Sequence, residues 1–586
     1  MLSVAKLGAG QQQYYLDSVA AGADEYYLGA GEQPGQWDGH GARLLALDGE
    51  VGSEALRRVL DGQDPSDQIW LTQRRPNRVP GFDLTFSAPK SVSVIYALAD
   101  EATSEVVGAA HDRAVTATLG WLEREACWTR AGSDGINRLR GEGFVAARFL
   151  HRTSRAGDPQ LHTHVLVANM TRTPDGRWRA LDAKMLLWQA QTAGYLYKAH
   201  LRHELASVLG VEWGPVSKGA AEIVGIPRGL LDLFATRRKD IEAELAERGL
   251  HSPQAAAVAA LETRPAKTAP TDLVSLRQRW RTATITAGYD PDLVNHIGGQ
   301  PSVAPASEAI EEAIAMLISK TGLTENTTIF DRRALLRAWC AQLPQGAPIP
   351  TIEQYANETL TRPEVIKLVG PSRFGTYTTQ ELVALEQHLT RQAIDSTRGN
   401  VAVVSQSALD TALTRRPSLS PEQTAAVTRL VTSGNGIDLL IAAAGTGKTF
   451  CLDAAASAWQ QSGYRVIGAA LAATAAAQLN AQTGIASDTI ALRTIQVAEQ
   501  ETFLDRNTVL IVDEAAMAGT RALAPLLDAA YNNATKVVLV GDPKQLDAIQ
   551  AGGLLAGLAR RIEPVTLIEN RRQTEPWERE IGRAHV

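Results

Sequence analysis

The stretch FLHRTSRAGDPQLHTHVLVANM, residues 149–170, decides the fold of the first part of this chain. His162 and His164 stand two residues apart in an apolar run, and side chains two apart on a strand share a face. His151 ends an earlier run, GFVAARFLH, that also has the pattern of a strand. The polar segment between the two runs predicts a hairpin connection. Antiparallel pairing would therefore bring the three imidazoles to one side of a sheet.

Three imidazoles on one sheet face form a candidate metal site. Neutral imidazoles bind a divalent cation and leave coordination positions open, as catalysis requires. Asp83 is the candidate acidic partner, because it sits among apolar neighbours on the strand that the alternation of GFDLTFSAP (81–89) predicts, with Thr85 on the same face. For His162 and His164 taken alone, a pair of hydrogen-bonded structural histidines is the competing explanation.

Two tyrosine pairs near the N-terminus, Tyr14–Tyr15 and Tyr26–Tyr27, are candidate nucleophiles. A phenol has a pKa of about 10 and is a poor nucleophile at neutral pH unless it is activated. A metal that polarises a phosphate, or a carboxylate that takes the phenol proton, lowers that demand. A single tyrosine pair favours an amphipathic core contact, whereas tyrosines, aspartate and histidines together favour chemistry.

The segments DPQLHTHVLVANM and GFDLTFSAPKSVS and the paired tyrosines resemble the TrwC/TraI class of conjugative relaxases, which are HUH (His-hydrophobe-His) endonucleases. The resemblance covers about the first 295 residues. It implies metal-dependent, strand-specific nicking at a DNA origin of transfer, with Mg²⁺ or Mn²⁺ as the cofactor. It also implies single-stranded origin DNA and conjugation accessory and coupling proteins as partners. In that chemistry a tyrosine keeps the 5′ phosphate and a 3′-OH is freed.

The resemblance also assigns roles by position. It makes His151, His162 and His164 the metal ligands and Asp83 the acidic partner of histidine and tyrosine. It makes Tyr14 the initial nucleophile and Tyr26 the second one, with Tyr15 and Tyr27 as the other members of the pairs. The insert LDSVAAGADE between the pairs is longer than the family pattern, which leaves the choice between Tyr14 and Tyr15 open.

Basic and aromatic residues around these segments are candidate DNA contacts, since cations neutralise phosphates and aromatic rings stack on bases. They are Arg74, Arg75, Arg78, Arg177, Trp178, Arg179 and Lys184. Lys90 is a further candidate, because it begins a helix directly after the strand of Asp83, where phosphate binding is favoured. A solvated surface explains the arginine clusters at least as well.

A second site is predicted by IAAAGTGKTF (441–450), which follows an apolar strand and opens a helix, as a P-loop does. Backbone amides of Gly445, Thr446, Gly447, Lys448 and Thr449 would cradle phosphates. The Lys448 ammonium would reach the β- and γ-phosphates, and the Thr449 hydroxyl would bind Mg²⁺. In VLIVDEAAM, Asp513 would hold Mg²⁺ and Glu514 would activate water.

Three further motifs resemble those of superfamily 1 helicases. They are Gln423 in an adenine-reading Q motif, Gln545 in a γ-phosphate-sensing motif, and Arg572 as an arginine finger. This half resembles the RecD-like 5′–3′ helicase region fused to such relaxases, which implies ATP with Mg²⁺ as a ligand. The chain stops at Val586, before the remaining motifs of the second RecA-like domain. The helicase is therefore expected to be truncated here, with doubtful motor activity.

The predicted organisation has three parts. Residues 1–295 form an α+β relaxase domain on an antiparallel sheet, 296–405 a helical connector, and 406–586 an α/β RecA-like P-loop lobe with a parallel sheet. The formal charge of −6 argues against a wholly basic DNA-binding coat.

Composition also bears on where the protein acts. Three scattered cysteines, no signal peptide and no long apolar run predict a cytoplasmic protein that is not inserted in a membrane. Two alternatives stay open: a rolling-circle replication initiator with the same chemistry, and a DNA-binding module that does not cleave. A three-histidine iron oxygenase is disfavoured, because it gives the tyrosines and the P-loop no use.

Overall fold

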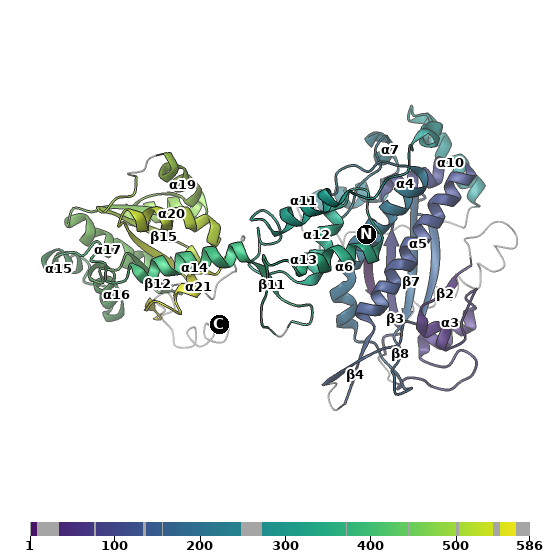
Figure 1. Ribbon diagram of the computed structural model, residues 1–586, viewed down its shortest axis with the longest axis horizontal. Coiled ribbons are helices and arrows are strands. Elements are labelled where there is room, and N and C mark those ends of the chain that lie inside the picture. Colours follow the sequence, from purple (N-terminus) through teal and green to yellow (C-terminus); the bar gives the residue numbers. More distant parts are fainter. Residues whose placement is uncertain are drawn as a thin grey trace. The chain divides into compact units, whose positions relative to one another are not determined.

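The computed structural model describes residues 2–8, 34–74, 78–132, 136–154, 156–247, 272–370, 372–443, 445–499, 503–542 and 551–569. The chain forms two compact units (Figure 1). Unit 1 consists of Met1–Ile310 and Arg333–Thr359, and unit 2 consists of Glu311–Arg332 and Leu360–Val586.

Unit 1 is built on a five-stranded antiparallel sheet (Figure 1). Its strands, in spatial order, are β1 (Leu2–Lys6), β3 (Gly81–Ser87), β7 (Pro159–Ala168), β6 (Ala146–Thr153) and β2 (Gln36–Asp38). The predicted hairpin is confirmed, since β6 and β7 pair antiparallel with His151 opposite His162. The alternation predicted for β3 is also confirmed, because Leu84 and Phe86 are fully buried while Asp83 is only part-buried.

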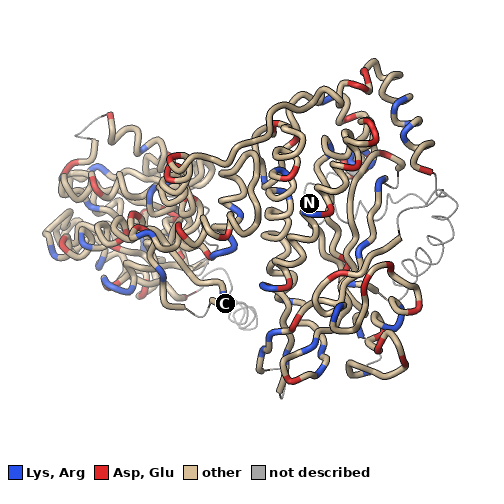
Figure 2. Tube along the Cα trace, turned by 45° about the vertical axis from the view of Figure 1, so that its right-hand side comes forward, with Lys and Arg blue, Asp and Glu red and all other residues tan. Residues whose placement is uncertain are grey.

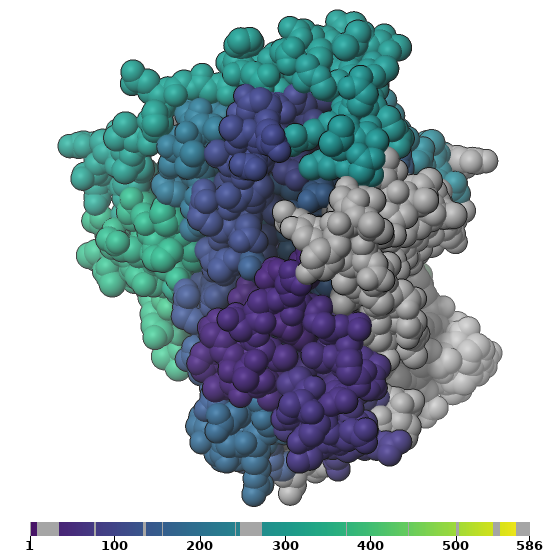
Figure 3. Space-filling view, turned by 90° about the vertical axis from the view of Figure 1, so that its right-hand side faces the viewer, coloured from purple at the N-terminus to yellow at the C-terminus, as the bar shows by residue number. Residues whose placement is uncertain are grey.

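Three helices pack on one face of this sheet. They are α4 (Lys90–Leu98), α5 (Glu101–Ala126) and α6 (Ala183–Leu209). Side chains from the helices reach the same sheet face: Ser93 of α4 accepts a hydrogen bond from the Leu161 amide, and Tyr197 of α6 packs edge-on against Phe86. On the opposite face, the small helices α2 (His40–Leu44) and α3 (Ser53–Asp61) pack at the β2 end, through a core that includes Trp37. In the space-filling view the segment that contains α2 and α3, coloured purple, lies directly against the blue part of unit 1 (Figure 3).

The remaining elements of unit 1 are two short hairpins and peripheral helices. The hairpins are β4 (Trp128–Ala131) with β5 (Asn137–Arg140) and β8 (Thr171–Arg172) with β9 (Trp178–Arg179). The helices are α7 (Arg228–Leu233), α8 (Thr236–Glu247), α10 (Leu273–Thr286), η2 (Pro291–His296), α12 (Arg332–Gln342) and α13 (Ile349–Leu360), while α11 (Ser307–Ile318) runs across the first boundary between the units.

Helices α12 and α13 are integral to unit 1, although they follow a segment of unit 2 in sequence. Arg202 of α6 is 1% exposed, and its guanidinium donates to the carbonyl oxygens of Cys340 (2.7 Å) and Leu343 (3.2 Å) at the end of α12. Trp121 and Arg124 of α5 both bond to Glu353 of α13. Unit 1 therefore needs residues well beyond the first 310 for its own packing.

We expect a fragment of residues 1–310 to be less stable than one of residues 1–360. Without α12, the buried guanidinium of Arg202 loses two acceptors, which costs about 1–3 kcal/mol or more. Loss of the burial of Trp339 removes roughly another 1.5–3 kcal/mol. Urea unfolding followed by circular dichroism should show a loss of about 3 kcal/mol or more in unfolding free energy. Equal midpoints for the two fragments would contradict this interpretation.

Unit 2 contains a six-stranded parallel sheet, as the alternation of strands and helices predicts. Its strands, in spatial order, are β14 (Ala486–Thr489), β13 (Arg465–Ala470), β15 (Thr508–Asp513), β16 (Lys536–Gly541), β12 (Ile437–Ala442) and β17 (Val565–Leu567). The strand β14 was not predicted, because its sequence, ASDT, has no run of large apolar residues.

Helices cover both faces of this sheet and bury two separate cores. They are α15 (Gln406–Thr414), α16 (Pro421–Thr432), α17 (Lys448–Gln461) and α18 (Ala473–Thr483) on one side, and α14 (Gln380–Asp395), α19 (Ile490–Glu499), η3 (Ala515–Met517), α20 (Thr520–Asn532) and α21 (Leu554–Leu558) on the other. A short hairpin of β10 (Val365–Lys367) and β11 (Tyr377–Thr379) precedes α14. Within the described ranges, no helix is long and apolar enough to cross a membrane.

Candidate functional site

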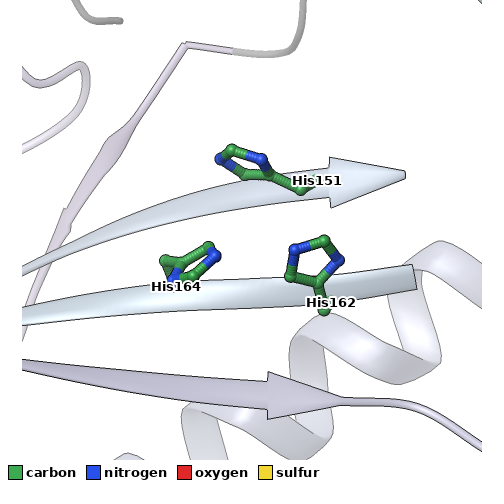
Figure 4. Close-up of side chains that lie close together, drawn as sticks. All are labelled: His151, His162 and His164. Carbon is green, nitrogen blue, oxygen red and sulfur yellow. The ribbon is translucent and has the colours of Figure 1, made fainter. Parts of the chain in front are cut away.

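His151, His162 and His164 come together on one face of the β6–β7 pair, as predicted (Figure 4). One ligand nitrogen from each ring lies within 4.8 Å of the others. The three ring centroids are 5.1–5.3 Å apart. The register of β6 and β7 produces this cluster, because His151 stands directly opposite His162 and His164 is the next residue on the same face of β7.

Hydrogen bonds hold two of the rings by their Nδ1 atoms. His164 Nδ1 lies 2.9 and 3.0 Å from the two carboxylate oxygens of Asp83, and His162 Nδ1 lies 2.9 Å from the carbonyl oxygen of Gln160. Each acceptor places the proton on Nδ1 and makes Nε2 the ligand atom. Burial, reinforced by the neighbouring His164, lowers the pKa of His162 to about 4. His162 is therefore neutral at physiological pH, the state that binds a metal.

Thr85 adds a third group to the contact between Asp83 and His164. Its hydroxyl donates to Asp83 Oδ1 (3.3 Å) and lies 3.2 Å from His164 Nδ1. The alternation along β3 predicted that Thr85 lies on this face, but the sequence analysis assigned it no role. The feature that could have identified it is a polar residue two positions after the acidic one. Thr85 restricts the Asp83 carboxylate to the orientation that meets His164.

These residues fit a divalent cation. Three part-buried nitrogen donors converge, two of them with fixed tautomers, and a carboxylate stands behind one ligand. A three-nitrogen set leaves coordination positions for a substrate oxygen, which is the arrangement of a catalytic rather than a structural metal site.

The candidate DNA contacts divide into two groups. Three bond to other groups of the protein: Arg78 donates to the carbonyl oxygen of Leu60 and Lys90 to that of Pro159 (2.9 Å), while Arg179 pairs with Asp175 (2.7 Å) at the surface. Burial lowers the pKa values of Arg78 and Lys90. Both are thus directed at backbone carbonyls rather than outward.

The other described candidates lie at the surface of unit 1. Arg74 stacks over the ring of Trp70, Arg177 and Lys184 are exposed, and Trp178 packs partly on the core beneath α3. Basic and acidic residues are interspersed along the chain (Figure 2), and the formal net charge is −6.

The predicted P-loop joins β12 to α17, with Gly445 and Gly447 at φ +85° and +82°. Lys448 begins α17 and pairs with Asp513 (2.8 Å) and Glu514 (2.7 Å) at the carboxyl end of β15. Burial acts to lower the pKa of Lys448, but the two carboxylates outweigh burial and raise it. The three groups predicted to handle phosphate, Mg²⁺ and water therefore meet in one place.

Gln423 braces the P-loop from α16. It is 3% exposed, its Oε1 accepts from the Ser420 amide (3.0 Å), and its Nε2 donates to the Thr446 carbonyl oxygen (3.0 Å). A Cβ at Gly447 would lie 2.4 Å from the same Nε2 and would displace the Gln423 amide, and the positive φ at this position favours glycine. Thr449 is the second residue of α17.

Several predicted site residues lie outside the described residues. They are Tyr14, Tyr15, Tyr26, Tyr27, Arg75, Gln545 and Arg572.

Comparison with known proteins matches both units to families. Residues 8–286 match the TrwC relaxase family, and residues 418–585 match an AAA domain family. Conjugal transfer protein TraA of Rhizobium radiobacter is 32% identical over 268 residues, covering 44% of this chain and 24% of TraA. Multifunctional conjugation protein TraI of Escherichia coli is 30% identical over 389 residues, covering 62% of this chain and 21% of TraI. The chain thus spans about a quarter or less of the length of these relatives.

Among solved structures, the metal-bound complex of the conjugative relaxase TrwC with oriT DNA is 34% identical to this chain. The match covers 50% of this chain and 100% of that one, with a TM-score of 0.44.

Proposed function

We propose that this chain, which contains a TrwC relaxase domain followed by an AAA domain, is a conjugative relaxase that nicks one DNA strand at an origin of transfer. The observation that carries the proposal is the cluster of three histidines with Asp83 bonded to one of them. The named relatives TraA and TraI are conjugation proteins, which supports the same function.

The proposed reaction is a transesterification. The phenol oxygen of Tyr14 attacks the scissile phosphorus, the bond from phosphorus to the 3′ oxygen breaks, and the phenol proton ends on the freed 3′-OH. The 5′ phosphate remains as a tyrosine ester, so no water is consumed. Tyr26 serves the second strand transfer, with Tyr15 and Tyr27 as the alternative members of each pair.

The histidine cluster supports this chemistry. A divalent cation held by His151, His162 and His164 would polarise a phosphoryl oxygen and stabilise the charge that develops on it. Asp83 fixes the ring of His164 through Nδ1, and Thr85 fixes Asp83. We propose Mg²⁺ or Mn²⁺ as the ion.

The proposed partners are single-stranded origin DNA, with conjugation accessory and coupling proteins, in the cytoplasm. Arg74, Arg177 and Lys184 are the described candidates best placed to meet phosphates, because their charged groups lie at the surface.

Cleavage of single-stranded oligonucleotides that tile a transfer origin tests the function. We expect a protein-linked 5′ end on a denaturing gel when Mn²⁺ or Mg²⁺ is present, and none with a chelator. Tight DNA binding without any adduct would favour a non-cleaving DNA-binding module. Cleavage at a replication origin instead of a transfer origin would favour a rolling-circle replication initiator.

We further propose that unit 2 binds ATP with Mg²⁺ as a helicase-like lobe. The P-loop amides from Gly445 to Thr449 would cradle the phosphates, and Lys448 would leave its carboxylate partners to meet them. Asp513 would then hold Mg²⁺ and Glu514 would activate water. Gln423 supports the loop that carries these amides.

Replacing Lys448 with alanine is expected to weaken ATP binding by about 100-fold. Hydrogen bonds from a cation contribute roughly 1.5–3 kcal/mol each, and 2.8 kcal/mol corresponds to about 10² in affinity. Titration with a fluorescent ATP analogue in the presence of Mg²⁺ measures this. Lys367→Ala, a lysine exposed on β10 of the same unit, is the matched control and should bind like the unmodified chain. Equal affinities for the two variants would exclude Lys448 from the site.

A further inference from the structure

A buried polar chain lies on the other face of β7, behind the histidine cluster. His111 of α5 lies with Nε2 2.8 Å from the Thr163 hydroxyl and with Nδ1 2.8 Å from the Tyr197 hydroxyl of α6. His111 and Tyr197 are fully buried, and Thr163 is 3% exposed. Thr163 is the residue between His162 and His164, so its side chain points away from the cluster while both neighbours point toward it.

This chain of polar groups sits among apolar side chains, where it is costly. Tyr197 packs edge-on against Phe86 at 5.4 Å, and the strand neighbours of Thr163 on that face, Leu161 and Val165, are fully buried. Polar groups buried in such surroundings lower stability unless every partner is satisfied, and satisfied networks impose one arrangement. Apolar side chains such as leucine or valine would fill the same space without this cost. We therefore infer that the hydrogen-bonded polar groups do more than fill the core.

The protons of this chain have one consistent arrangement. Burial raises the pKa of Tyr197 well above its ordinary value, so the phenol keeps its proton and donates to His111 Nδ1. Burial lowers the pKa of His111 to about 3, so the ring is neutral and its one proton is on Nε2. Nε2 therefore donates to the Thr163 oxygen. The position of the Thr163 hydroxyl oxygen is therefore set by side chains of α5 and α6, and neither helix carries a residue of the metal site.

We propose that His111 and Tyr197 are positioning residues that act through Thr163 to fix the geometry of the two histidines of β7. Hydrogen bonds from α5 and α6 hold the side chain of Thr163 in place. Because Thr163 lies between His162 and His164 on the same strand, this also fixes the backbone that carries the two histidines. Metal ligands must be placed to within about 0.5 Å, and outer partners that orient them typically change metal affinity by 10–100-fold. The inference rests on the proposed metal site.

Two substitutions of Thr163 separate positioning from packing. Thr163→Ser keeps the hydroxyl and loses the methyl, whereas Thr163→Val keeps the shape and loses the hydroxyl. We expect Thr163→Val to bind Mn²⁺ about 10-fold or more weakly and Thr163→Ser to bind like the unmodified chain. Isothermal titration of the whole chain with MnCl₂ measures both. The matched control is Thr118→Val, a fully buried threonine of α5 that bonds only to the Ala114 carbonyl of its own helix among the described contacts.

The outcomes are distinct. Weak Mn²⁺ binding by Thr163→Val with normal binding by Thr163→Ser and Thr118→Val supports the proposal. Equal binding by Thr163→Val and Thr118→Val, or a loss in Thr163→Ser only, overturns it. If Thr163→Val does not fold, Tyr197→Phe removes only the outer hydroxyl and should weaken Mn²⁺ binding in the same direction; unchanged binding overturns the proposal. Failure of the unmodified chain to bind Mn²⁺ would instead reject the metal site itself.

Discussion

Replacement of His162 with alanine is expected to reduce DNA cleavage by about 10³-fold or more. A bound cation that neutralises charge on a phosphoryl oxygen contributes several kcal/mol to the transition state, and about 4 kcal/mol corresponds to roughly 10³ in rate. His162 stands directly opposite His151 and beside His164 on one strand face, so its loss removes one of three nitrogen donors that lie at nearly equal distances from one another. The remaining pair of imidazoles would hold a divalent ion much more weakly.

The measurement pairs Mn²⁺ titration with single-turnover cleavage of an origin oligonucleotide. His296→Ala, an exposed histidine of η2, is the matched control and should retain both activities. Imidazole nitrogen suits transition metals better than Mg²⁺, so Mn²⁺ should support cleavage by the unmodified chain at lower concentrations than Mg²⁺. Cleavage by His162→Ala at the unmodified rate, with either ion, would show that the cluster is structural.

Much of the histidine site could be predicted from the sequence because strand geometry is local. The period of two fixed the face shared by His162 and His164, and a short polar connection fixed the antiparallel partner that carries His151. The same period placed Asp83 on the matching face of β3, where it meets His164. The P-loop was predictable for a similar reason, since its strand, loop and helix are continuous in sequence.

Contacts between distant segments could not be predicted in this way. His111 reaches Thr163 across 52 residues and Tyr197 across 86, and no pattern in α5 or α6 distinguishes these two side chains from ordinary helix residues. Arg78 and Lys90 point inward because the folded chain brings backbone carbonyl oxygens within hydrogen-bond distance of their charged groups, which the sequence pattern does not show. The packing of α12 and α13 into unit 1 likewise depends on tertiary contacts such as that of Arg202.

Replacement of Tyr14 with phenylalanine is expected to abolish the covalent protein–DNA adduct. Phenylalanine keeps the ring and removes the only atom that can form the phosphate ester, so nothing replaces the lost nucleophile. In enzymes with covalent intermediates, loss of the nucleophile costs on the order of 10⁶ in rate. Metal and DNA binding should persist, because the histidine cluster is formed by β6 and β7.

The matched control is Tyr15→Phe, the neighbouring phenol, which should still form the adduct. An adduct that survives Tyr14→Phe but disappears in Tyr15→Phe would move the nucleophile by one residue and leave the reaction unchanged. If only the double substitution of both tyrosines removes the adduct, the two phenols substitute for each other at the scissile phosphate. An adduct that survives the double substitution and is lost in Tyr26→Phe would make the second pair the initial nucleophile. Mass spectrometry of the DNA-linked peptide distinguishes these cases directly, because the phosphate ester marks the residue that attacked.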